Sequence, residues 1–404
     1  MSSPAERAGM SRVAARLRIF YFTYFITVGI YYPFLVPHLR AIGLGGSEIG
    51  TAQMAGSIAA IPASFLWGAL ADRLQAPARA LKVATRCAFL AALGLVFART
   101  PLTVALLLFM RGLAEPAIIP LSDTVAVNAV HAEPGASYAR VRLFGSLGFV
   151  VSAQGAGLLL ARFSDADGAR VMPLAYAATL LVTTVVAELL PAEQLERGPK
   201  PHLRDVRALA ADRRLILLLA ACAVHSATLA TYPLFGTLVH DRGLSPAVTG
   251  AGMAFGVIAE VIVLFTFPVL ERSFSIATLL ACAFGVTALR WWLVSQDLPA
   301  AWLVAVQAFH GLSYGLYWAC AVTALSRWVP ARLRATGQAM FSSIASSLGG
   351  AIGYRLAGFG YERLGGAGPV YGWTAAVELV ALGLALRLRA DERQSAPVLK
   401  DDAG

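Results

Sequence analysis

Charged side chains are scarce in this sequence. They make up 14% of its 404 residues, whereas 58% are hydrophobic, and a soluble domain carries about 25% charged residues. So little charge excludes one large water-facing domain. Continuous apolar runs, such as 215–238 and 300–325, fill nearly the whole chain instead. Backbone groups in lipid are satisfied only in helices or closed barrels, and these runs lack the alternation of barrel strands. The sequence therefore predicts an all-α membrane protein.

Motifs for metal, cofactor or nucleotide chemistry are also missing. The four cysteines lie singly inside apolar runs, so they form neither a disulfide framework nor a metal-ligand spacing. The chain has no H-E-x-x-H motif, no paired-aspartate diphosphate motif and no Walker loop. No segment is long and polar enough for a signalling domain. A membrane enzyme or sensor is therefore a remote alternative, and neither a cofactor nor a metal is expected.

The positions of the lysines and arginines along the chain indicate the membrane topology. The net charge is +10, which in a soluble protein would favour nucleic acid. Here lysines and arginines gather at both ends of the chain and in alternate gaps between apolar runs, as they do in cytoplasmic loops. We therefore expect no nucleic acid partner, and an inner-membrane, multi-pass protein with both termini in the cytoplasm.

About twelve transmembrane helices are expected, because each crossing needs about 20 apolar residues. A charged, proline-containing stretch over 191–214 separates a first bundle of six helices (1–190) from a second bundle with a short tail (215–404). The predicted spans are 19–39, 47–71, 81–99, 102–128, 142–162, 170–190, 215–240, 246–270, 275–295, 299–327, 335–359 and 369–389.

The two halves repeat each other. Residues 200 positions apart are identical at many places across the first two helices of each half, without any gap. These pairs include Tyr32/Tyr232, Pro33/Pro233, Gly43/Gly243, Leu44/Leu244, Gly50/Gly250, Gly56/Gly256 and Ile58/Ile258. Parallel repeats related by an axis along the membrane normal are a transporter architecture, with the binding site between the halves near the midplane. The repeat therefore predicts a secondary transporter.

Three ionisable residues lie deep in predicted helices of the second half. They are Glu260, Arg290 and His310, on the eighth, ninth and tenth spans. Ionisable groups inside a membrane cost several kcal/mol and need a partner or a water-filled cavity. A carboxylate, a guanidinium and an imidazole around one cavity would suit proton coupling. The alternative is a buried ion pair that only fixes helix packing.

The first half has its own buried charges. Arg111 and Glu115 are four residues apart on one helix, which allows an ion pair beside Pro116. Asp123 follows on the same helix, and Arg142 opens the next. All four are candidate substrate ligands, although mutual neutralisation or an interfacial role would explain them as well.

Further candidates are isolated side chains. His225, near Tyr232, is either a ligand or a packed histidine. Glu378 on the last helix is expected outside the cavity, in a structural role. Aromatic side chains such as Tyr32, Tyr232 and Tyr314 would line a cavity or pack in the core. Small residues around Gly148 and Gly349 allow close helix packing, either static or where the halves move against each other.

Several motifs resemble the major facilitator superfamily. The segment 68–73, Gly-Ala-Leu-Ala-Asp-Arg, is similar to its loop signature G-x-L-a-D-r, and 268–272 is a degenerate copy in the second half. The segments 29–34, 120–123, 138–146, 258–261, 289–291, 310–312 and 333–338 resemble the branch containing phenylpropionate permeases and, more distantly, lactose permease. The resemblance covers nearly the whole chain.

This resemblance implies a proton-driven symporter with alternating access. Asp123 and Arg142 match the permease's substrate pair, and Glu260, Arg290 and His310 match its coupling group. The position three residues past the histidine is Ser313 here, where that permease has a carboxylate, so proton carriage would fall on Glu260. Gln338 lies in a matching segment and is a candidate substrate ligand. Gly68, Asp72 and Arg73 match the gating loop.

The expected function is uptake of a small organic solute, such as an aromatic acid, a sugar or a nucleoside, together with protons. The fifth helix lacks the proline-glycine motif associated with drug antiporters of the superfamily. Export of an amphipathic or aromatic compound is therefore the alternative. A monomer within the lipid bilayer is expected to be sufficient.

Overall fold

The computed structural model describes residues 4–74, 76–132, 137–191, 209, 211–330 and 333–395. Within these ranges the chain is helical, without strands. Nine described helices are long and apolar enough to cross a membrane by themselves. Together with α2 and two helices interrupted by tighter or wider turns, they make the twelve expected spans. The predicted linker 191–214 lies mostly outside the described residues.

The first half contains six spans. Their elements are α1 (Pro4–Ala41), α2 (Gly46–Leu74), α3 (Pro77–Phe97), α4 (Pro101–Ala114), η1 (Glu115–Ala117), α5 (Ile118–Ala132), α6 (Tyr138–Leu160) and α7 (Asp165–Glu188). The fourth span comprises α4, η1 and α5, because Pro116 interrupts regular α-helical hydrogen bonding.

The second half repeats this order. Its elements are α9 (Arg213–Leu229), α10 (Leu234–Asp241), α11 (Pro246–Ser273), α12 (Ile276–Ser295), α13 (Ala300–Val306), η2 (Gln307–Phe309), η3 (Gly311–Leu316), α14 (Tyr317–Trp328), α15 (Arg334–Met340), η5 (Phe341–Leu348), α16 (Gly349–Leu364) and α17 (Ala367–Ser395). The seventh span breaks before Pro233, and the tenth and eleventh contain the π-helical turns η3 and η5.

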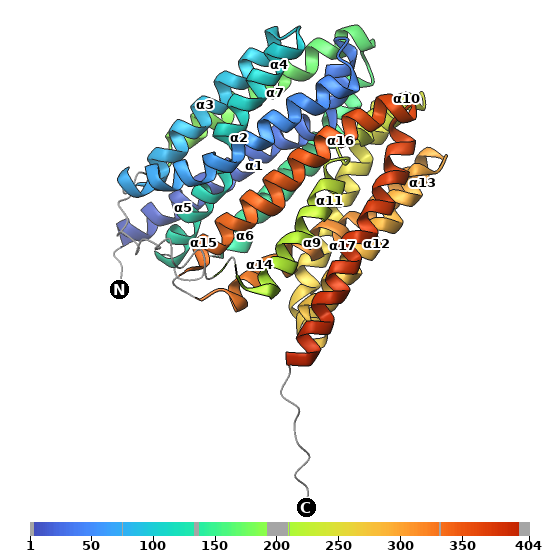
Figure 1. Cartoon of the computed structure of the whole chain (residues 1–404). Coiled ribbons are helices and arrows are strands. Elements are labelled where there is room, and N and C mark those ends of the chain that lie inside the picture. Colours follow the sequence, from blue (N-terminus) through green and yellow to red (C-terminus); the bar gives the residue numbers. More distant parts are fainter. Residues whose placement is uncertain are drawn as a thin grey trace, which may run out of the picture.

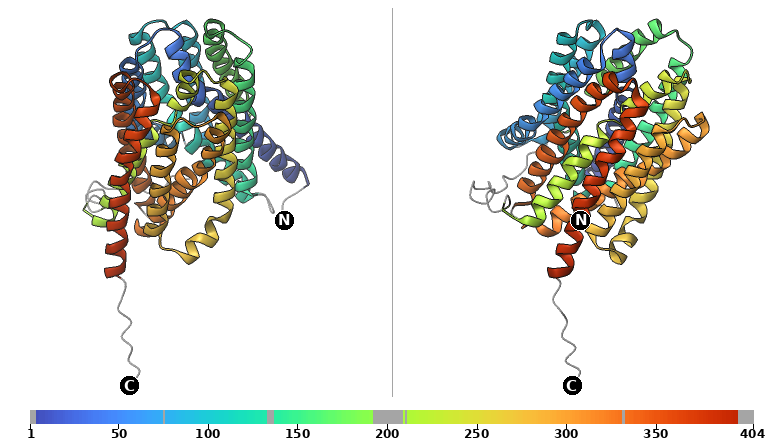
Figure 2. Two further views of the ribbon diagram at one scale, coloured as in Figure 1. Left: turned by 90° about the vertical axis from the view of Figure 1, so that its right-hand side faces the viewer. Right: turned by 45° about the vertical axis from the view of Figure 1, so that its right-hand side comes forward.

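The helices run alongside one another, and the two halves form neighbouring groups (Figure 1). The start of α1 and the end of α17 lie toward the same end of the molecule (Figure 2). We call the opposite end, which holds the turns 42–45, 161–164, 242–245 and 365–366, the distal end. Gly43 and Gly243, a pair from the sequence repeat, end α1 and α10 there with φ of 94° and 66°. Only glycine adopts such a conformation readily, which explains this identity between the halves.

The halves meet through α2 against α16 and through α6 against α11. Both contacts rely on glycine near the distal end. A Cβ on Gly50 would lie 2.5 Å from the Tyr354 carbonyl oxygen, and one on Gly250 would lie 2.4 Å from that of Ala153. By contrast, Gly148 packs on α1 and Gly349 on α9, each within its own half. The small residues noted in the sequence therefore serve mainly to pack each bundle.

Candidate functional site

Arg290 on α12 is at the centre of a polar network in the second half. Its side chain is fully buried. One terminal nitrogen donates to Gln307 Oε1 at 2.6 Å, and the other donates to Ser313 Oγ at 3.0 Å and lies 3.1 Å from His310 Nδ1. The guanidinium also lies over the rings of Tyr232 and Trp291, at 4.7 and 4.6 Å. Hydrogen bonds to the two terminal nitrogens and the ring faces thus replace water that this cation loses, whereas Nε has no hydrogen-bond partner among the described residues.

His310 connects Arg290 to Glu260. A guanidinium can only donate, so His310 Nδ1 accepts, and a neutral ring then carries its hydrogen on Nε2. That nitrogen lies 3.5 Å from Glu260 Oε2. The ring is stacked between Tyr232 and Tyr314, at 4.9 and 5.2 Å between centroids. The three groups lie together in the structure, but the arginine reaches the acid only through the histidine.

A π-helical turn brings His310 and Tyr314 against α11. The turn η3 begins directly after His310, and such turns are frequent at functional sites. Glycines allow the close approach: a Cβ on Gly311 would lie 2.5 Å from the Ala259 carbonyl oxygen, and one on Gly315 would lie 3.0 Å from Glu260 Cγ. Glu260 remains partly accessible, with 21% of its side chain exposed, whereas Ser313 and Gln307 are fully buried.

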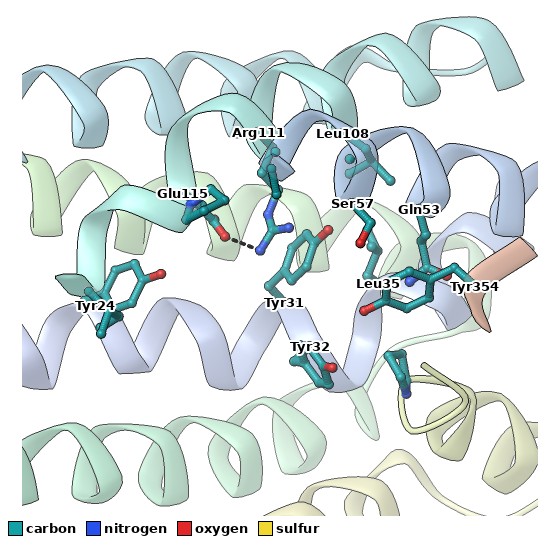
Figure 3. Close-up of a pocket in the computed structure, with 16 residues that line it drawn as sticks. Tyr24, Tyr31, Tyr32, Leu35, Gln53, Ser57, Leu108, Arg111, Glu115 and Tyr354 are labelled. Carbon is teal, nitrogen blue, oxygen red and sulfur yellow. Dashed lines mark hydrogen bonds and ion pairs between the residues drawn. The ribbon is translucent and has the colours of Figure 1, made fainter. Parts of the chain in front are cut away.

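The first half holds a separate charged cluster. Arg111 pairs with Glu115, as their spacing predicts. Tyr176 on α7 donates to Glu115 Oε1 at 2.8 Å, and its hydroxyl accepts from Arg111 Nε at 3.2 Å. The guanidinium also lies 3.8 Å from the centroid of Tyr31 (Figure 3). Arg111 and Glu115 therefore neutralise each other and are oriented by two tyrosines.

This cluster borders a cavity of about 360 Å³. Most of the wall comes from α1, α2 and α4, and Pro233 and Tyr354 close it from the second half. Polar groups of Gln53, Ser57 and the tyrosines gather around it (Figure 3). The lining residues are Tyr24, Tyr31, Tyr32, Leu35, Gln53, Gly56, Ser57, Ala60, Leu108, Arg111, Gly112, Glu115, Pro116, Ile119, Pro233 and Tyr354.

Asp123 and Arg142 share an aromatic neighbour. Tyr21 donates its hydroxyl hydrogen to Asp123, and the Arg142 guanidinium lies 5.6 Å from the Tyr21 ring and 4.3 Å from the Phe25 ring. Among the described residues, Arg142 forms no ion pair. Its charge is thus met by ring faces, and it remains partly exposed.

The remaining candidates are dispersed. Tyr32 lines the cavity and lies 6.2 Å from its repeat partner Tyr232, ring to ring, across the boundary between the halves. His225 does not line the cavity and instead contacts Glu378 inside the second bundle. Gln338 is exposed on α15, away from the cavity lining, and Arg73 is exposed on α2. The surroundings of Gly68 and the side chain of Asp72 fall outside the described part of the structure.

Four residues of the site were not predicted from the sequence. Gln307 holds Arg290, and Gln53, Tyr176 and Tyr354 contribute to the cavity or its charged cluster. The two glutamines lie in apolar helices, where a buried amide needs a hydrogen-bond partner, so their positions could have been predicted as part of a site. The two tyrosines could not, because a tyrosine at such a position packs in a hydrophobic core equally well.

Most of the chain is similar to known membrane transporters. The model of the "MFS_1 like family" matches residues 14–371. The maltose permease of Geobacillus stearothermophilus is 30% identical over 93% of this chain and 94% of its own length. The probable 3-phenylpropionic acid transporter of Escherichia coli (strain K12) is 30% identical over 86% and 91%. A crystal structure of the nucleoside transporter NupG superimposes with a TM-score of 0.81 at 16% identity, covering 93% of this chain and 99% of that one.

Proposed function

This chain belongs to the MFS_1-like family of multi-pass membrane transporters, and from that premise we propose that it takes up a small organic solute together with protons. Its relatives are named as transporters rather than enzymes. Proton coupling, the direction of transport and the substrate class are the parts of this proposal that need support from the site.

The observation that carries the proposal is the chain of contacts from Glu260 through His310 to Arg290. Glu260 is the partly exposed end of this chain of contacts, although it is not among the residues that line the cavity. We infer that this carboxyl group exchanges its proton as access alternates between the two sides of the membrane, which is the requirement for symport.

The cavity supports a neutral, polyhydroxylated substrate. Arg111 and Glu115 already pair with each other, so the wall offers hydrogen bonds without a free charge. Tyrosine rings present flat faces to a sugar ring or a nucleobase, and their hydroxyl groups, with Gln53 and Ser57, suit ligand hydroxyls. Maltose permease and NupG, both similar to this chain, are named for substrates of this kind.

An aromatic carboxylic acid is the second candidate. It is favoured by Arg142, a guanidinium without an ion pair among the described residues, and by the similarity to the probable 3-phenylpropionic acid transporter. A thermal-shift screen with maltose, uridine and 3-phenylpropionate separates the two classes, because a bound ligand raises the melting temperature by mass action. Stabilisation by the acid alone would overturn the neutral-substrate proposal.

The test of coupling is Glu260→Gln, a neutral isostere of the protonated acid. In proteoliposomes, the variant should still exchange the stabilising ligand across the membrane. Uphill accumulation driven by an inward proton gradient should fall to the level seen without a gradient. Glu188→Gln is the control, since Glu188 lies at the end of α7 and pairs with the exposed Arg86 at 2.8 Å.

Accumulation by Glu260→Gln at the wild-type level would show that Glu260 is structural. Accumulation driven only by an outward gradient in the wild type would favour export. We also propose that the distal end faces away from the cytoplasm in the inner membrane, because few lysines and arginines lie there. Labelling of Asp297→Cys, at an almost fully exposed distal position, should occur from outside intact cells.

A further inference from the structure

A second ionisable cluster lies inside the C-terminal bundle, away from the cavity lining. Glu378 on α17 and His225 on α9 both have fully buried side chains. His225 Nδ1 is 2.7 Å from Glu378 Oε1, and Thr228, one turn further along α9, contacts Glu378 Oε2. Nothing in the coupling chain of Glu260, His310 and Arg290 uses these groups.

The hydrogens around Thr228 can be counted. Its hydroxyl lies 2.9 Å from the backbone oxygen of His225 and also contacts Glu378 Oε2. A threonine hydroxyl has one hydrogen, so it donates to only one of these two oxygens. If it donates to the backbone, as helical threonines do, the second contact needs a hydrogen from the carboxyl group. This geometry fits a protonated Glu378 that donates to Thr228.

The histidine is consistent with this count. His225 Nε2 is buried and has no hydrogen-bond partner among the described residues. A charged ring would leave an N–H donor of a cation unpaired at that atom, which is far more costly than an unpaired lone pair. A neutral ring with its hydrogen on Nδ1 donates to Glu378 Oε1 and leaves only the lone pair on Nε2. Both members of the pair are then uncharged.

No compensating charge faces the pair within the described part of the chain. The titratable groups that face the pair are Cys222 on α9 and Tyr317 on α14, and toward α12 the His225 ring meets Phe284 at 4.7 Å. Among the described residues of α10, α12 and α16, no arginine or lysine forms an ion pair with Glu378. An ionised carboxylate without a cation is costly at such a position.

We propose that Glu378, with His225 and Thr228, is a second proton-binding site, occupied in this conformation and separate from Glu260. The site includes the last turn of α9, directly before the break over 230–233. Tyr371 on α17 donates to the Thr231 carbonyl oxygen in that break at 2.9 Å, and the next residue, Tyr232, stacks on His310. Loss of the proton would require α9 and α17 to shift until Glu378 finds water or new donors, and that shift would displace Tyr232.

Infrared difference spectroscopy of the purified full-length protein tests the site without any transport assay. A protonated carboxylic acid in an apolar interior has a C=O band that an ionised carboxylate lacks. At neutral pH we expect wild type to show a band that disappears in Glu378→Gln. Thr228→Val should shift this band, since it removes the hydrogen-bond acceptor, and Glu260→Gln should leave it in place.

A potentiometric titration provides a second measurement. Detergent-solubilised Glu378→Gln should release one proton fewer than wild type between neutral and strongly alkaline pH. Identical spectra and identical titrations of wild type and Glu378→Gln would overturn the proposal. If Glu378→Gln does not fold, Thr228→Val still tests it, because an unchanged C=O region in that variant contradicts a proton shared with Thr228. Neither result depends on whether Glu260 couples transport.

Discussion

At the level of single residues, Arg290 has the most demanding environment in the second bundle. A guanidinium at the centre of a bilayer costs roughly 2.5–3.5 kcal/mol by insertion scales and more in simulations. Its planar donors meet Gln307, Ser313 and His310 in different directions, and two ring faces cover it. The positive charge is therefore stabilised by contacts that require the planar, branched shape of a guanidinium.

Replacement of Arg290 by lysine should be poorly tolerated although it keeps the charge. An ammonium lacks the planar fork and cannot reach the same three partners. Each lost hydrogen bond to a charged group costs roughly 1.5–3 kcal/mol, so the melting temperature of Arg290→Lys should fall clearly and proton-driven accumulation should fall at least tenfold. Arg334→Lys, at an exposed position of α15, is the control. Wild-type melting and accumulation in Arg290→Lys would contradict this account of the network.

At the level of elements, the N-terminus of α2 is capped by the other half of the molecule. Glu362, exposed near the end of α16, accepts from the Ser47 backbone N–H at 3.0 Å and from its hydroxyl at 2.6 Å. A carboxylate is favourable at a helix N-terminus because of the unpaired N–H groups and the helix dipole. Arg40 lies 5.0 Å from the ring of the adjacent Tyr361. These contacts join the halves at the distal end.

This capping contact should depend on pH. The hydrogen bonds from the Ser47 hydroxyl and backbone N–H hold the pKa of the Glu362 carboxyl below its usual value. Because the pKa is lowered, the contribution of the contact is full above the ordinary glutamate pKa of about 4.3. It is lost as the pH falls through the lower folded value. At neutral pH the contact is therefore at full strength, and only a mutation removes it.

Glu362→Gln should open the distal end more often. Thr237 is 2% exposed and lines a small pocket together with Gly46 and Tyr361, the neighbours of Ser47 and Glu362 in the chain. Thr237→Cys therefore reports opening by its rate of reaction with a membrane-impermeant thiol reagent, in a background without Cys87 and Cys282. Loss of the carboxylate should raise that rate by roughly two- to fivefold. Glu48→Gln is the matched control, because Glu48 bonds to Gly45 within its own half. Equal rates in the two variants would assign no gating role to Glu362.

At the level of the whole molecule, most of the fold could be predicted from the sequence. Apolar runs predicted the spans, and the 200-residue repeat predicted the two similar halves. Buried charges identified Glu260, Arg290 and His310 as a group, since each is costly in a membrane unless partnered.

Contacts between helices could not be predicted in the same way. Whether Asp123 contacts Arg142 directly or through Tyr21 depends on the rotation of the helices about their axes. A π-helical turn such as η3 has no characteristic amino-acid composition from which it could be predicted. Glu378, interpreted as structural from the sequence, lies against His225 because α17 packs beside α9. Helical periodicity does not specify such neighbours.

The repeat also makes a prediction about how the halves separate. Gly50 and Gly250 occupy equivalent places, one against α16 and one against α6, and a methyl group at either would collide with backbone of the opposite half. Gly50→Ala and Gly250→Ala should each force the distal contact apart and raise the labelling rate of Thr237→Cys, while each bundle keeps its own packing. Gly155→Ala on α6 is the control, because no atom of the described residues beyond its chain neighbours and its own helix backbone lies within 4 Å of its Cβ position. Labelling at the wild-type rate in both variants would mean that the closed distal end does not depend on these glycine contacts.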